Sequence, residues 1–124
     1  MVLELAAAFG RGPPPARTLV FLLATGEEVG LLGTEYYLEH PAMPLDATVA
    51  NINFEMVGRP DPLVGGAGKL WLTGFDKTNV GSAWNAAGLP IATDERPEQH
   101  FYERSDNFAF VERRVIAQSG LPWL

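Results

Sequence analysis

The feature that most constrains the fold is an apolar run, Thr18 to Ala24, which is followed at once by a turn and two acids. The run is rich in β-branched and large apolar residues, which is typical of a strand buried on both faces. Thr25 and Gly26 give a turn signal, and apolar residues then recur with helical spacing over residues 29–39. The sequence therefore predicts a strand, a tight turn and a helix, as in α/β proteins with a mostly parallel sheet.

Two adjacent acids, Glu27 and Glu28, stand at the predicted carboxyl end of this strand. In open α/β sheets, ligands bind at that edge. The helix dipole favours acids in a first turn, so the pair has an ordinary structural explanation. The chemical explanation is that neighbouring residues point in different directions, so that one carboxylate can hold a metal while the other accepts a proton. The pair alone does not decide between these explanations.

A second apolar strand, predicted over residues 48–56, carries one acid, Glu55, near its carboxyl end. A Glu within apolar sequence is costly to bury unless it is paired or bound to a metal. A solvated strand end explains it equally well. Glu55 thus also has both a structural explanation and a chemical one.

The remaining elements are predicted from periodicity and from their stop signals. They are a helix at residues 1–9, strands at 69–73, 89–93 and 115–117, and helices at 77–87 and 105–113. Core candidates in the first helix are Val2, Leu3, Leu5, Ala6 and Phe9, and Trp71 is a core candidate in the strand at 69–73. Ser105 is the expected N-cap of the last helix.

Three segments carry a further signal through their order and spacing: ATGEEVGLLG at 24–33, NINFEMVG at 51–58 and RSDNFAF at 104–110. Together they resemble the zinc aminopeptidases and carboxypeptidases of metallopeptidase family 28 (clan MH). The resemblance covers the chain to about Gln118. It implies a three-layer αβα fold, zinc-exopeptidase-like but incomplete, with a mostly parallel, mixed sheet and helices on both faces.

The resemblance also implies roles for the acids. Glu27 matches the general base and Glu28 a zinc ligand, and Glu55 matches a zinc ligand where many relatives have Asp. Relatives carry in addition a His-x-Asp motif before the first helix and a His after the Ser-Asp segment, which have no counterpart in this sequence. Residues 1–124 are therefore interpreted as a single partial peptidase domain, a fragment.

The activity implied by the resemblance is hydrolysis of peptides with a free N-terminus by a zinc-dependent, aminopeptidase-like exopeptidase. Complete relatives hold two zinc ions, whereas weak or absent zinc binding, and no activity, are expected of this chain alone. Two alternatives share the fold: an acyltransferase resembling glutaminyl cyclases, and a non-catalytic interaction module. The two histidines, His40 and His100, are more simply surface residues than metal ligands.

Composition excludes several other classes of protein. The chain is 47% hydrophobic and 19% charged, so disorder is not indicated. Its net charge of -6 and the lack of a basic stripe argue against nucleic acid as a partner. No apolar run approaches the ~20 residues of a membrane span. The absence of cysteine excludes disulfides and thiolate zinc sites, and the sequence indicates no compartment.

Overall fold

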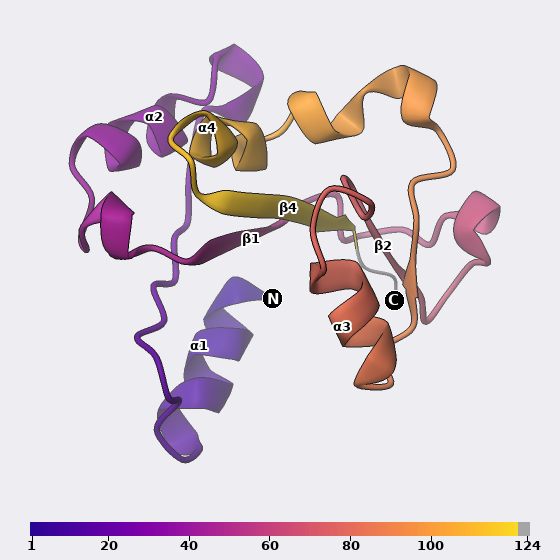
Figure 1. Ribbon diagram of the computed structural model, residues 1–124, viewed down its shortest axis with the longest axis horizontal. Helices are drawn as coiled ribbons and strands as arrows, with labels where there is room; N and C mark the ends of the chain where they lie inside the picture. The colour runs from indigo at the N-terminus through magenta and orange to yellow at the C-terminus, as the bar shows by residue number, and fades with distance from the viewer. Residues whose placement is uncertain (122–124) are drawn as a thin grey trace. The chain divides into compact units, whose positions relative to one another are not determined.

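The computed structural model describes residues 1–121, and these belong to two compact units, Met1–Ala42 and Met43–Leu124 (Figure 1). The first unit contains helices and extended chain. The second contains the sheet. The prediction of one partial domain over residues 1–124 stays a prediction.

The first unit begins with helix α1, Val2–Arg11, which runs two residues beyond its predicted end and continues through Gly10. The prediction that this helix supplies core residues is wrong for the unit as described, because no residue of α1 is buried. Leu3 is 67% exposed and Phe9 is 47% exposed, although the Phe9 ring lies 6.2 Å from that of Phe21. The apolar face of α1 is thus covered in part.

The strand predicted at residues 18–24 is absent from the structure, where these residues form no regular element. A strand is stabilised by hydrogen bonds to a neighbouring strand, and the first unit offers no strand for it to pair with. Three of its large side chains, Leu19, Val20 and Leu23, remain 42–62% exposed. The preference of residues 18–24 for the strand conformation is therefore not enough to form a strand without a neighbouring strand.

The second unit contains a four-stranded sheet in the order β1-β4-β2-β3. The strands are β1 at Ala50–Phe54, β2 at Leu70–Leu72, β3 at Ile91–Ala92 and β4 at Ile116–Leu121. β1 pairs with β4 and β2 with β3 in parallel, while β2 and β4 are antiparallel. The sheet is therefore mixed and mostly parallel, which confirms the predicted fold class.

Helices cover the sheet of the second unit from both sides. Figure 1 shows α3, Val80–Ala86, on one face and α4, Asp106–Glu112, on the other. Buried apolar residues from the sheet and from α4 form the core between these layers: Trp71, Leu72, Ile91, Ala109, Phe110, Val115 and Ala117. Trp71 is 3% exposed, which confirms its predicted place in the core.

Short 3-10 turns fill most of the connections. They are η2 at Leu45–Ala47, η3 at Pro62–Val64, η4 at Pro97–Gln99 and η5 at Phe101–Glu103. Among the described residues, none of the helices combines the length and the apolar character that crossing a membrane requires.

Candidate active site

Glu27 and Glu28 lie together on one 3-10 turn, η1, at Glu27–Val29. The turn is bounded by Gly26 and Gly30, which both have positive φ, at 70° and 104°. Such φ values are strained for residues with a Cβ, so the two glycines allow the chain to turn sharply on either side of the acids. Glu27 is half-buried and Glu28 is exposed. The turn thus gives the two carboxylates different exposure to solvent.

A third glycine, Gly33, ties this turn to the helix that follows. Its N–H donates to the carbonyl of Thr25 at 2.7 Å, and α2 then runs over Leu32–Glu39. A Cβ built on Gly33 would lie 2.5 Å from the Thr25 nitrogen and 2.7 Å from its oxygen. The sequence Thr-Gly-Glu-Glu-Val-Gly-Leu-Leu-Gly therefore encodes a close backbone approach. The predicted helix at 29–39 starts later than expected, since residues 27–29 form the 3-10 turn.

The change Gly33→Ala is expected to destabilise the first unit by about 1–3 kcal/mol, because backbone atoms have to move to make room for the new methyl group. Gly10→Ala is the matched control, since no atom lies within 4 Å of a Cβ at that helical position. Its effect should be neutral or slightly stabilising, by up to ~1 kcal/mol. Urea denaturation measures the free energy of unfolding of each variant. Equal stabilities would contradict the close approach of Gly33 to Thr25.

Glu55 lies in the second unit, directly after the last residue of β1, Phe54, and it is half-buried. The next residue, Met56, has a positive φ of 50° and is 79% exposed. The chain therefore turns away from the sheet immediately after Glu55. This places the acid at the carboxyl end of β1, as the sequence predicts.

A buried polar network begins at Asn53, near the carboxyl end of β1. The Asn53 Nδ2 group donates to the hydroxyls of Ser105 and Ser119, at 3.0 and 3.1 Å. The two hydroxyls lie 2.6 Å apart, and both serines are at most 4% exposed. Asn53 precedes Glu55 by two residues, and Ser105 is the second residue of the Arg104–Phe110 segment. Two of the three sequence motifs are thus joined by a direct hydrogen bond.

The network continues into α4 and across the sheet. The Ser119 hydroxyl donates to Asn107 Oδ1 at 2.7 Å, and Asn107 Nδ2 donates to the Tyr102 carbonyl at 3.1 Å. The Ser119 N–H also lies 3.2 Å from the hydroxyl of Thr73. Asn107, Ser119 and Thr73 are fully buried. Since buried polar groups must be paired, this set of bonds fixes the start of α4 against β1 and β4.

Sequence reasoning missed most of this network. Ser105 occupies the predicted N-cap position, but its hydroxyl makes no cap hydrogen bond and serves the network instead. Ser119 fell outside the predicted strand at 115–117, because polar residues interrupted the apolar pattern. A signal was present in Asn51 and Asn53, which alternate with apolar residues and so lie on one face of β1.

Both histidines are exposed, as predicted. The His40 ring stacks on Tyr36 with 4.5 Å between centroids, at the end of α2. His100 Nδ1 lies 4.0 Å from Glu103 Oε2. Neither observation gives a histidine the partners of a metal ligand.

The acids have the right chemistry for zinc, which accepts carboxylate oxygen. Within residues 1–121, however, no three His, Cys, Asp or Glu side chains are grouped so as to hold a metal ion. Two carboxylates, Glu28 and Glu55, fall short of the three protein ligands typical of catalytic zinc. The donor set of the described residues is therefore partial. That Glu28 and Glu55 are zinc ligands stays a prediction.

Comparison with known proteins identifies the chain. The sequence profile of peptidase family M28 matches residues 1–120. The chain therefore belongs to peptidase family M28, which confirms the resemblance seen in its three motif segments.

Two relatives illustrate the relationship. A vacuolar membrane protease of Lachancea thermotolerans is 33% identical over 108 residues, which make up 86% of this chain and 10% of that protein. The structure of an aminopeptidase from Aneurinibacillus sp. strain AM-1 is similar with a TM-score of 0.54 and 22% identity, over 82% of this chain and 24% of that one. The second likeness supports the fold. The chain thus spans a small part of the length of either relative.

Proposed function

We propose that this chain forms part of a zinc-dependent exopeptidase that acts on peptides with a free N-terminus. Glu27 is the general base, and Glu28 and Glu55 are metal ligands. The observation that carries the proposal is the turn at Glu27–Val29, which holds two acids with different exposure inside a chain of peptidase family M28. The similarity to a protein named as an aminopeptidase supports the choice of substrate.

The proposed chemistry divides between two kinds of group. Zinc, when bound, supplies a Lewis acid for the peptide carbonyl and for water. Glu27 accepts the proton of the attacking water and returns it to the leaving amine. Its half-buried position on the turn limits the number of orientations that its carboxylate can adopt.

The first test is zinc binding by the 124-residue chain, measured by calorimetry. Two carboxylates without imidazole are expected to give no tight site. A tight, stoichiometric site that is lost on changing His100 to Ala would assign His100 as a ligand and contradict its interpretation as a surface residue.

The second test uses a protein in which this chain is joined to segments that supply a His-x-Asp motif and a further His. We expect this protein to hydrolyse aminoacyl anilides, a chelator to abolish the activity, and added zinc to restore it. Zinc binding together with cyclisation of N-terminal glutamine would favour the acyltransferase alternative. Zinc binding without either activity would favour the interaction module.

A further inference from the structure

A cavity of about 480 Å³ lies in the second unit, at the carboxyl ends of the parallel strands β2 and β3. Its volume falls within the range of ~300–1,000 Å³ that is usual for small-ligand sites. The segments that line it are residues 74–77 after β2, residues 93 and 94 after β3, and Pro97 with residues 100–103 from η4 and η5. Loops beyond the carboxyl ends of parallel strands are where α/β proteins place ligands.

This cavity is distinct from the strand end that carries Glu55. β1 is parallel to β4, and β4 is antiparallel to β2, so the carboxyl ends of β1 and β2 point to opposite edges of the sheet. Glu55 does not line the cavity. The cavity is therefore open to a role that does not depend on Glu55.

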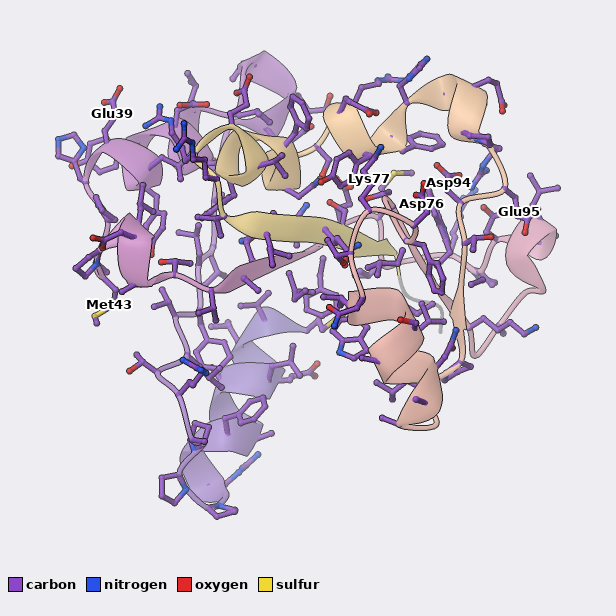
Figure 2. The ribbon with its side chains drawn as sticks, viewed as in Figure 1. Glu39, Met43, Asp76, Lys77, Asp94 and Glu95 are labelled. Carbon is purple, nitrogen blue, oxygen red and sulfur yellow. The ribbon has the colours of Figure 1, made fainter. Side chains whose placement is uncertain are left out.

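The charged groups around the cavity are mostly acidic. Asp76, Asp94 and Glu103 line it, with Lys77 as the lining residue of permanent positive charge. Figure 2 shows Asp76, Lys77 and Asp94 gathered in one region of the unit. Three carboxylates against one ammonium leave an excess of negative charge, which attracts cations.

Aromatic rings form another part of the wall. Phe75, Phe101 and Tyr102 line the cavity, and Lys77 Nζ stands 5.2 Å from the centre of the Tyr102 ring. The chain's own ammonium group thus already makes a cation–π contact in the cavity. A wall that combines rings and carboxylates suits a cation on an apolar stem, because the rings pack on the stem while the acids pair with the charge.

The titration of Tyr102 agrees with a negative environment. Burial raises the pKa of the Tyr102 phenol above its usual value, and the nearby carboxylates Glu103 and Asp76 raise it further. A neutral, protonated Tyr102 therefore persists to higher pH than an exposed tyrosine.

A fully buried polar group lies beside the cavity wall. Gln118 Nε2 donates to the carbonyl of Gly74, a lining residue, at 2.7 Å. Gln118 Oε1 is buried and has no partner among the described residues. This acceptor lies behind the wall and does not line the cavity, so it makes no direct contact with a ligand bound there.

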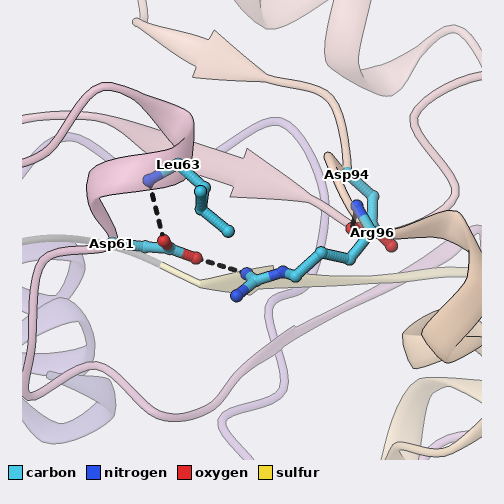
Figure 3. Close-up of polar contacts among 4 residues, drawn as sticks. All are labelled: Asp61, Leu63, Asp94 and Arg96. Carbon is cyan, nitrogen blue, oxygen red and sulfur yellow. Dashed lines mark hydrogen bonds and ion pairs between the residues drawn. The ribbon is translucent and has the colours of Figure 1, made fainter.

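The loop that carries most of the lining residues is held in place by Arg96. Its guanidinium pairs with Asp61 (Figure 3). The same group also lies 5.2 Å from the centre of the Trp71 ring and 5.4 Å from that of Phe101. The Arg96 N–H donates to Asp94 Oδ1 at 2.8 Å. These contacts order Asp94 and Phe101 before any ligand arrives, which lowers the entropic cost of binding.

We propose that this cavity binds a guanidinium or alkylammonium group on a short apolar stem, as carried by an Arg or Lys side chain of a peptide. The cation pairs with Asp76, Asp94 and Glu103, and its stem packs on Phe75, Phe101 and Tyr102. Lys77 competes for the same space. The proposal is independent of catalysis and stands whether or not the chain joins a zinc site.

The test is NMR titration of the 124-residue chain with acetyl-Ala-Arg-Ala-amide. The uncharged control is the same tripeptide with norleucine in place of Arg. We expect saturable shifts at residues 74–77 and 93–103 with the Arg peptide, and none with the norleucine peptide. Butylguanidine is a third probe. If it binds more weakly than the Arg tripeptide, the guanidinium that the cavity recognises belongs to a peptide. If it binds equally well, a free guanidine is sufficient. Both results support a cation site.

Three variants sharpen the test. Asp76→Asn should weaken binding roughly three- to ten-fold, because it removes one nearby charge. Asp46→Asn makes the same charge change at an exposed position on η2 and should leave binding unchanged. Lys77→Gln should strengthen binding by a similar factor, because the competing ammonium is gone. A general loss of folding cannot produce that gain in affinity.

Several results would overturn the proposal. They are the absence of saturable shifts, equal shifts with the norleucine peptide, shifts confined to residues outside the lining, and weaker binding by Lys77→Gln. Since no step of the titration involves zinc or hydrolysis, failure here leaves the proposed peptidase function untouched, and failure of the peptidase assays leaves this result untouched.

Discussion

Changing Glu27 to Gln is expected to abolish peptide hydrolysis while zinc stays bound, in a protein where this chain is joined to the His and Asp ligands of the family. Gln has the size of Glu but cannot accept the proton of water, a role worth ~10²–10⁴ in rate. The measurement is the rate of aminoacyl anilide hydrolysis together with the zinc content of the purified protein.

The neighbouring change, Glu28→Gln, should instead lose metal, because a neutral amide is a poor zinc ligand. Glu39→Gln is the matched control: it makes the same chemical change at an exposed residue that ends α2 in the same unit. It should leave both rate and zinc content unchanged. If Glu27→Gln lost zinc and Glu28→Gln kept it, the roles of base and ligand would have to be exchanged.

The second large effect is expected from Asn107→Leu in the buried network. Leu has the same branching and the same number of side-chain heavy atoms as Asn, but it cannot accept from the Ser119 hydroxyl or donate to the Tyr102 carbonyl. Both of those groups are then left without this buried partner, at a cost of ~1–3 kcal/mol each. We expect a loss of about 2–6 kcal/mol in the free energy of unfolding, measured by urea denaturation.

The control for this change is Asn79→Leu. Asn79 precedes α3, is exposed and makes no side-chain cap hydrogen bond. A substitution at such a surface position usually changes stability by less than ~0.5 kcal/mol. If the two variants unfolded at the same urea concentration, the network would contribute nothing to the stability of the second unit.

Much of the second unit could be predicted from the sequence. Strands β1, β2 and β3 lie inside the ranges predicted from apolar runs, and α3 and α4 lie inside the predicted helices. Each is shorter than predicted, because periodicity shows which residues face the core but not where the hydrogen-bonded ladder ends. The prediction of a strand at residues 18–24 is wrong for a related reason. An apolar run indicates a preference for the strand conformation, but a strand also needs a neighbouring strand to pair with.

The parts of the candidate site that depend on residues close together in the sequence could be predicted. The glycines around Glu27 and Glu28 mark a turn that the structure confirms, and Glu55 lies at its predicted strand end. The network of Asn53, Asn107 and Ser119 was not predictable in this way, because its members are up to 66 positions apart and meet through folding. The roles of Glu27 as general base and of Glu28 and Glu55 as metal ligands remain predictions.

The position of β4 in the middle of the sheet has a consequence for synthesis on the ribosome. Ala50 of β1 pairs with Ile116, and β2 reaches β1 through β4 alone. At roughly 5–20 residues per second, β1 waits several seconds for its partner to be translated. A nascent chain stopped before residue 116 holds the β2–β3 pair and no other pairing of this sheet. The unit can therefore close only after β4 has left the exit tunnel, and until then β1 has no partner in this sheet.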